Sequence, residues 1–101
     1  MKSKIAFITG ATAGIGKEVA IELAKIGYDL IICGRRKDKL LEVNNELSRH
    51  GAKVYSKVLD VRNRQDVLDF FAELPPNWSD IDVLVNNAGL AAGLDSFANG
   101  S

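Results

Sequence analysis

The chain has 101 residues, of which 47% are apolar and 26% charged, and its formal net charge at pH 7 is zero. This composition predicts one small globular domain, and it argues against disorder and against a nucleic-acid or membrane partner held by bulk charge. No apolar run approaches the ~20 residues of a membrane-spanning helix, and none suits a signal peptide. The single cysteine, Cys33, excludes an internal disulfide, so we expect a cytoplasmic protein.

The chain begins with a pattern of strand, glycine turn and helix. The apolar run Ile5–Ile8 predicts a buried strand. Three glycines follow it, and beyond them apolar residues at helical spacing predict an amphipathic helix with an apolar side made of Ile15, Val19, Leu23 and Ile26. Gly27 is placed to end that helix in a left-handed turn.

Each glycine of the turn has a predicted role. Gly10 allows a sharp turn, Gly14 allows backbone N–H groups to approach a phosphate, and Gly16 allows the helix to pack closely on the strand. The helix start adds unpaired N–H groups and a positive dipole end. The turn therefore predicts a dinucleotide-phosphate site, and the alternative is a glycine turn without a ligand. The residues of this site are Gly10, Ala11, Thr12, Ala13, Gly14, Ile15 and Gly16.

Three more strands and two more helices follow in alternation. A second unbroken apolar run predicts a strand over Leu30–Cys33, and further strands are predicted over Val54–Leu59 and Ile81–Val85. A helix between the first two strands has an apolar side made of Leu40, Val43 and Leu47, and it ends near Gly51. The last helix begins at Asn63, an N-cap with Asp66 in a weak capping box, and ends at Pro75-Pro76. Its apolar side consists of Val67, Phe70, Phe71 and Leu74; Asn77–Asp80 read as loop, and 90–101 show no reliable period.

This alternation predicts the fold class α/β. We expect a Rossmann-type, doubly wound parallel sheet with strand order 3-2-1-4 and three helices. Such sheets bind ligands beyond the carboxyl ends of their strands. The glycine turn and the clusters that follow the other three strands should therefore meet at one edge.

The end of the second predicted strand indicates which cofactor binds. A cofactor with ribose hydroxyls alone favours an acidic residue there, but the sequence has Gly34, which leaves room for a 2′-phosphate. Arg35 and Arg36 follow and offer charged, bidentate phosphate donors. The sequence therefore predicts NADP(H) rather than NAD(H). The alternative is that the two arginines form a solvated cap before a helix.

The motifs together resemble the short-chain dehydrogenase/reductase family. The resemblance rests on Thr-Gly-x-x-x-Gly-x-Gly at 9–16, Asp60-Val61, and Asn-Asn-Ala-Gly at 86–89. It implies that Asp60 accepts a hydrogen bond from the adenine amino group and that Val61 meets the adenine ring. It also implies that Asn86 braces the sheet, while the cofactor ribose is lined by Asn87, Ala88 and Gly89. Without the family match, Asp60 and the asparagines could be ordinary turn residues.

The residues within and around these motifs resemble those of the NADP-dependent 3-hydroxy acid dehydrogenases, which include serine 3-dehydrogenases. That resemblance implies hydride transfer between NADP(H) and a small 3-hydroxy acid or a serine-like hydroxyl. It also implies a homo-oligomer, a dimer or tetramer, for the full-length protein.

Family catalysis uses a serine, a Tyr-x-x-x-Lys pair and an asparagine, and this chain lacks that pair. The only tyrosines, Tyr28 and Tyr55, are followed four residues on by Ile32 and Leu59. We therefore expect no catalytic residue and no metal site here, and we read 1–101 as the amino-terminal NADP-binding part of a longer reductase. The alternative is a truncated, non-catalytic dinucleotide-binding polypeptide. The sequence allows two roles for Trp78, as an anchor of its loop or as a subunit contact.

Overall fold

Four parallel strands, numbered along the chain, form one sheet in the order 3-2-1-4, which confirms the predicted fold class and strand order. The computed structural model describes residues 3–12 and 14–86. The strands are β1 (Ile5–Thr9), β2 (Asp29–Gly34), β3 (Val54–Val58) and β4 (Val83–Asn86). Each is bounded within two residues of its predicted range, and in β1 and β2 the unbroken apolar runs mark the part of the strand that is covered on both faces.

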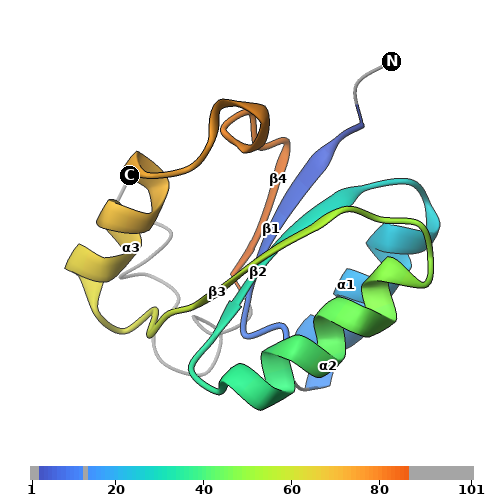
Figure 1. The fold of residues 1–101 in the computed structure, drawn as a ribbon, viewed down its shortest axis with the longest axis horizontal. Coiled ribbons are helices and arrows are strands. Elements are labelled where there is room, and N and C mark those ends of the chain that lie inside the picture. The colour runs from blue at the N-terminus through green and yellow to red at the C-terminus, as the bar shows by residue number, and fades with distance from the viewer. Residues whose placement is uncertain (1–2, 13, 87–101) are drawn as a thin grey trace.

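Three helices cover the two faces of the sheet (Figure 1). Helices α1 (Gly14–Lys25) and α2 (Lys37–Ser48) lie on one face, and α3 (Arg64–Ala72) lies on the other. Successive residues of β1 point to opposite faces, so Ala6 and Ile8 pack under α1 and α2 while Ile5 and Phe7 pack with α3. Within the described ranges, no helix is long and apolar enough to cross a membrane.

The buried side of α1 differs from the predicted one. The sequence favoured Ile15 and Ile26 as buried positions, but they are 68% and 70% exposed, so that prediction is wrong. The buried positions are Gly16, Ala20 and Ala24. These small residues recur every four positions and allow the helix axis to lie close to the sheet. The other two predicted positions, Val19 and Leu23, are partly buried against the same cluster.

The end of α3 and the start of β4 also differ from the sequence prediction. The Asn63 side chain caps α3 as predicted, since its Oδ1 accepts from the Asp66 N–H at 3.2 Å. The helix ends at Ala72, ahead of the two prolines, and the segment predicted as loop contains a 3-10 turn, η1 (Pro76–Trp78). Strand β4 begins two residues later than predicted because Asp82 ties the chain to β1 with its carboxylate, whose Oδ2 accepts from the Ile5 N–H at 2.8 Å.

Candidate functional site

The carboxyl ends of the four strands meet at one edge of the sheet. Thr9 at the end of β1 lies opposite Cys33 of β2 and Asn86 of β4, and Gly34 lies opposite Val58 of β3. The glycine turn, the double arginine and Asp60-Val61 therefore lie along the same edge (Figure 1). Of the predicted site residues, Ala13, Asn87, Ala88 and Gly89 lie outside the described residues.

The turn between β1 and α1 contains two glycines with a left-handed backbone. Gly10 has φ of 64° and Gly14 has φ of 59°, both in the left-handed region that side chains disfavour. No heavy atom lies within 4 Å of a Cβ built on Gly14, so the backbone conformation rather than crowding requires glycine there. Ala11 is fully buried and anchors the turn, and the first turn of α1 has no acidic residue to offset its dipole.

Gly34 packs against this turn. A Cβ built on Gly34 would lie 3.0 Å from Thr12 Cγ2, which is closer than ordinary van der Waals contact. The sequence suggested that Gly34 leaves room for a ligand phosphate, but part of that room is filled by the Thr12 side chain. Glycine at this position therefore also lets the end of β2 and the glycine turn lie in contact.

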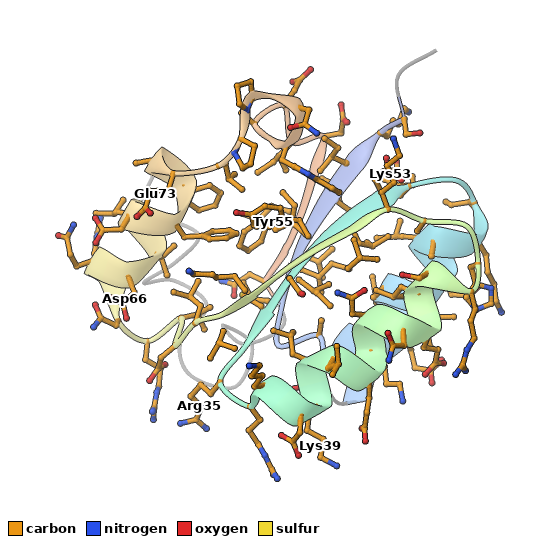
Figure 2. All side chains as sticks on the ribbon, in the orientation of Figure 1. Arg35, Lys39, Lys53, Tyr55, Asp66 and Glu73 are labelled. Atoms are coloured by element: carbon orange, nitrogen blue, oxygen red, sulfur yellow. The ribbon has the colours of Figure 1, made fainter. Side chains whose placement is uncertain are left out.

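The two arginines that follow β2 differ in their surroundings. Arg36 is the N-cap residue of α2 and makes no side-chain capping bond, and its Nε lies 3.9 Å from Asp38 Oδ1, a loose ion pair. Arg35 projects from the end of β2 (Figure 2). Its guanidinium is exposed and makes no hydrogen bond or ion pair with the described part of the chain. Arg35 is therefore the better placed of the two to bind an added anion.

Asp60 forms a close ion pair that the sequence did not indicate. Its Oδ1 accepts from the Arg62 backbone N–H at 3.0 Å and from Nε at 3.1 Å, and its Oδ2 accepts from Nη2 at 3.0 Å. These bonds to Arg62, and the charge of Arg35, lower the pKa of Asp60 to about 2. Asp60 is thus an ionised acceptor at the end of β3. Val61 is half-buried against the cluster under α3.

Asn86 links β4 to β1 at the same edge. The Thr9 hydroxyl, which is fully buried, donates to Asn86 Oδ1 at 2.9 Å. The bond from the hydroxyl to the amide oxygen holds the carboxyl ends of β1 and β4 next to each other. This contact fits the bracing role that the resemblance implied for Asn86.

Replacing Thr9 with valine is expected to lower the free energy of unfolding by about 0.5–1.5 kcal/mol, because the part-buried hydrogen bond from the Thr9 hydroxyl to Asn86 Oδ1 is lost. Urea unfolding followed by circular dichroism measures the change. Thr9→Ser is the matched control, since serine keeps the hydroxyl, and it should lose less than Thr9→Val. Equal stability of Thr9→Val and the parent chain would contradict the bracing role.

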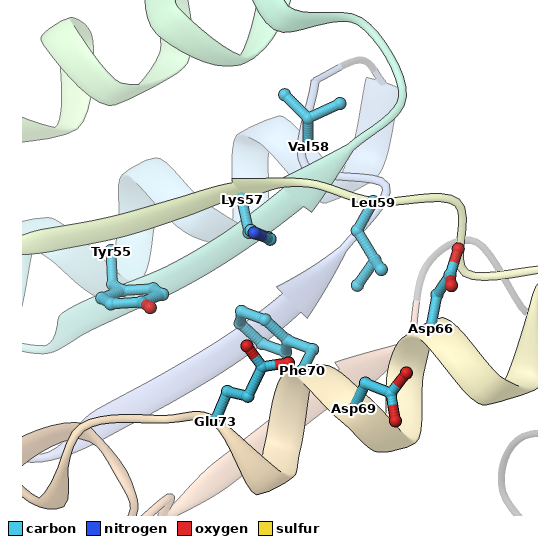
Figure 3. Close-up of a pocket in the computed structure, with 8 residues that line it drawn as sticks. All are labelled: Tyr55, Lys57, Val58, Leu59, Asp66, Asp69, Phe70 and Glu73. Carbon is cyan, nitrogen blue, oxygen red and sulfur yellow. The ribbon is translucent and has the colours of Figure 1, made fainter.

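A groove of about 380 Å³ lies between β3 and α3, away from the glycine turn (Figure 3). Phe70 points from α3 toward Tyr55 and Lys57 of β3. Three carboxylates and one ammonium line the groove: Asp66, Asp69, Glu73 and Lys57. Its net negative charge is unfavourable for an anionic dinucleotide, and none of the predicted site residues lines it.

The described residues offer binding groups rather than reactive ones. Burial raises the pKa of the Cys33 thiol to about 12, so this cysteine is a core residue and not a nucleophile, as the sequence suggested. No group of three or more His, Cys, Asp or Glu side chains in 3–12 and 14–86 could hold a metal ion. The arrangement suits a ligand with phosphates near the glycine turn and Arg35, and a hydrogen-bond donor near Asp60.

Comparison with protein families gives a match over nearly the whole chain. The profile described as short chain dehydrogenase matches residues 4–100. The NADP-dependent 3-hydroxy acid dehydrogenase YdfG of Shigella flexneri is 45% identical over 91 residues, which cover 90% of this chain and 36% of that protein. Sulfoacetaldehyde reductase 2 of Chromohalobacter salexigens is 45% identical over 89 residues, which cover 88% of this chain and 35% of that protein.

Solved structures of serine dehydrogenases also match most of this chain. A serine dehydrogenase from Escherichia coli has a TM-score of 0.74 at 41% identity, with 82% of this chain and 37% of that chain covered. A closed form of serine dehydrogenase complexed with NADP+ has a TM-score of 0.73 at 41% identity, with 82% and 32% covered. The chain thus spans about a third of the length of these relatives.

Proposed function

Because the chain belongs to the short-chain dehydrogenase family, we propose that it binds NADP(H) as the cofactor-binding part of an NADP-dependent oxidoreductase. The observation that carries this proposal is the pair Gly34 and Arg35 at the end of β2. The position that favours an acid in NAD-binding sheets is a glycine packed on Thr12, and the next residue presents an unpaired guanidinium. Relatives named as NADP-dependent support the same cofactor.

The residues present fit the cofactor from the adenine end to the pyrophosphate. The glycine turn and the start of α1 would hold the pyrophosphate through Gly10, Ala11, Thr12, Ala13, Gly14, Ile15 and Gly16. Arg35 and Arg36 would bind the 2′-phosphate, and Asp60 and Val61 the adenine. Asn87, Ala88 and Gly89 would line the ribose. NADP(H), when bound, supplies or accepts the hydride, and these residues orient it.

We propose a small 3-hydroxy acid or a serine-like hydroxyl as the substrate of the whole protein. The names of the relatives support this substrate class, since they include a 3-hydroxy acid dehydrogenase and serine dehydrogenases. The test is NADP+ reduction by the purified whole protein with a panel of serine, allo-threonine and small 3-hydroxy acids. Activity on steroids or acyl-carrier thioesters instead would overturn the substrate class but not the family.

We also propose that residues 1–101 are the amino-terminal, cofactor-binding part of a longer, homo-oligomeric, cytoplasmic reductase. This reading is supported by the match to the 3-hydroxy acid dehydrogenase YdfG of Shigella flexneri, which covers only 36% of the length of that protein. The alternative is a non-catalytic dinucleotide-binding polypeptide. The reading frame after Ser101 distinguishes them: a continuing frame with Tyr-x-x-x-Lys favours the enzyme, and a stop codon favours the alternative. Sedimentation of the whole protein tests the oligomer.

Residues 1–101 expressed alone are expected to be marginally stable, prone to associate and inactive. Strand β4 is an edge of the described sheet, and its Leu84 is 50% exposed. An open apolar edge promotes association, and a small domain buries a smaller share of its surface. Thermal unfolding, sedimentation and NADPH oxidation with hydroxy acids measure these properties. A soluble monomer with a sharp transition would contradict the stability claim. Turnover abolished by a substitution within these residues would show that the chemistry lies here.

A further inference from the structure

The side chain of Arg62 holds Asp60 in one orientation at the edge where the predicted cofactor site lies. Its Nε and Nη2 groups donate to different oxygens of the carboxylate, at 3.1 and 3.0 Å, and its backbone N–H donates to Oδ1 at 3.0 Å. Two parallel N–H···O bonds between a planar guanidinium and a carboxylate fix the plane of both groups. Asp60 is therefore oriented before any ligand arrives.

This ion pair has little to contribute to folding. Both side chains are solvent-accessible, at 63% for Arg62 and 35% for Asp60, and they lie two residues apart in one loop. Exposed pairs of this kind add little to stability. The main effect of the contact is therefore on the orientation of the Asp60 carboxylate.

The bond pattern also shows which oxygen can accept a further bond. A carboxylate offers about four lone-pair sites on its two oxygens. From the described residues, Oδ1 accepts two bonds, both from Arg62, and Oδ2 accepts one. The remaining acceptor site of the pair is therefore on Oδ2.

We propose that Arg62 is a positioning residue for adenine recognition, which orients Asp60 so that its Oδ2 accepts a hydrogen bond from the exocyclic amino group of the cofactor. This inference rests on the proposed NADP(H) site. An amino group is a donor, whereas the 6-oxo group of hypoxanthine is an acceptor, so an ionised, oriented carboxylate favours the first and repels the second. Arg62 and Arg35 are the charged groups that act on Asp60, and they keep its pKa at about 2, so it stays an acceptor throughout the neutral range.

The test compares two cofactors in the whole protein: NADPH and reduced nicotinamide hypoxanthine dinucleotide phosphate. The parent protein should bind NADPH at least about tenfold more tightly, as expected for a hydrogen bond to a charged group. Arg62→Gln and Arg62→Lys should both reduce this ratio to below about threefold, because neither side chain forms the two-point contact. Arg49→Gln is the control, an exposed arginine at the end of α2, and should keep the parent ratio.

A second readout is the pKa of Asp60, followed by carboxyl ¹³C NMR. It should rise from about 2 toward the ordinary value near 4 in Arg62→Gln. An unchanged adenine preference in both Arg62 variants would overturn the inference while leaving the NADP(H) site intact. Equal binding of both cofactors by the parent protein would overturn it as well, because Asp60 would then not read the amino group. Absence of NADPH binding would overturn the proposed function itself.

Discussion

Arg35→Ala is expected to weaken NADP(H) binding by about tenfold or more, because it removes a charge-assisted contact worth about 1.5–3 kcal/mol. Arg35 is expected to give the larger effect of the two arginines, since Arg36 is engaged with Asp38 and the start of α2. NAD(H) lacks the 2′-phosphate, so its binding should be nearly unchanged. Fluorescence titration of the whole protein with NADPH and NADH measures both dissociation constants.

Arg49→Ala is the matched control for this experiment. It removes the same charge from an exposed position at the end of α2, away from the carboxyl edge of the sheet. It should leave both affinities within about twofold, since surface substitutions away from a site change free energies by less than about 0.5 kcal/mol. An equal loss of NADP(H) and NAD(H) affinity in Arg35→Ala would rule out a 2′-phosphate contact.

Phe7→Ala is expected to lower the free energy of unfolding by about 3–5 kcal/mol, the range for removal of a buried aromatic ring. Phe7 is fully buried in the centre of the sheet. Its ring centroid lies 5.5 Å from that of Phe70 and 5.1 Å from that of Phe71, so it joins the sheet to α3. Because small domains have about 5–15 kcal/mol of stability in total, the variant should lose a large share of it.

Denaturant unfolding of the whole protein measures this loss, and Leu41→Ala is the control. Leu41 lies on α2 and is 57% exposed, so its truncation should change stability by less than about 0.5 kcal/mol. A loss below about 1 kcal/mol in Phe7→Ala would mean that α3 does not depend on this aromatic contact.

The order of the elements and the bounds of the first two strands could be predicted from the sequence because they depend on local features. The unbroken runs that became β1 and β2 occupy both faces of a covered strand, so they need no knowledge of their partners. Gly10 and Gly14 likewise marked a turn, and the structure gives both a positive φ. The Asn63 cap was predicted because its partner, Asp66, is only three residues away.

The helix faces were less predictable. Apolar spacing pointed to Ile15 and Ile26 as buried positions, but the sheet packs against Gly16, Ala20 and Ala24 of α1. Hydrophobicity identifies which residues favour burial, whereas the distance between helix and sheet decides which residues fit there. Trp78 illustrates the same limit: its half-buried ring packs 5.7 Å from Tyr55, which anchors η1 to the sheet, and no local pattern connects these two residues.

The sequence by itself determined the strand–helix order, the glycine turn and the chemistry that follows each strand, because φ preferences and periodicity are properties of a few consecutive residues. Only the tertiary structure decided how those groups meet. It places Gly34 against Thr12, 22 positions earlier, and it turns the Arg62 guanidinium onto Asp60. The first contact depends on the pairing of β1 with β2, and the second on a side-chain rotamer. Neither is encoded in a spacing, because both result from packing and hydrogen-bond geometry in the folded chain.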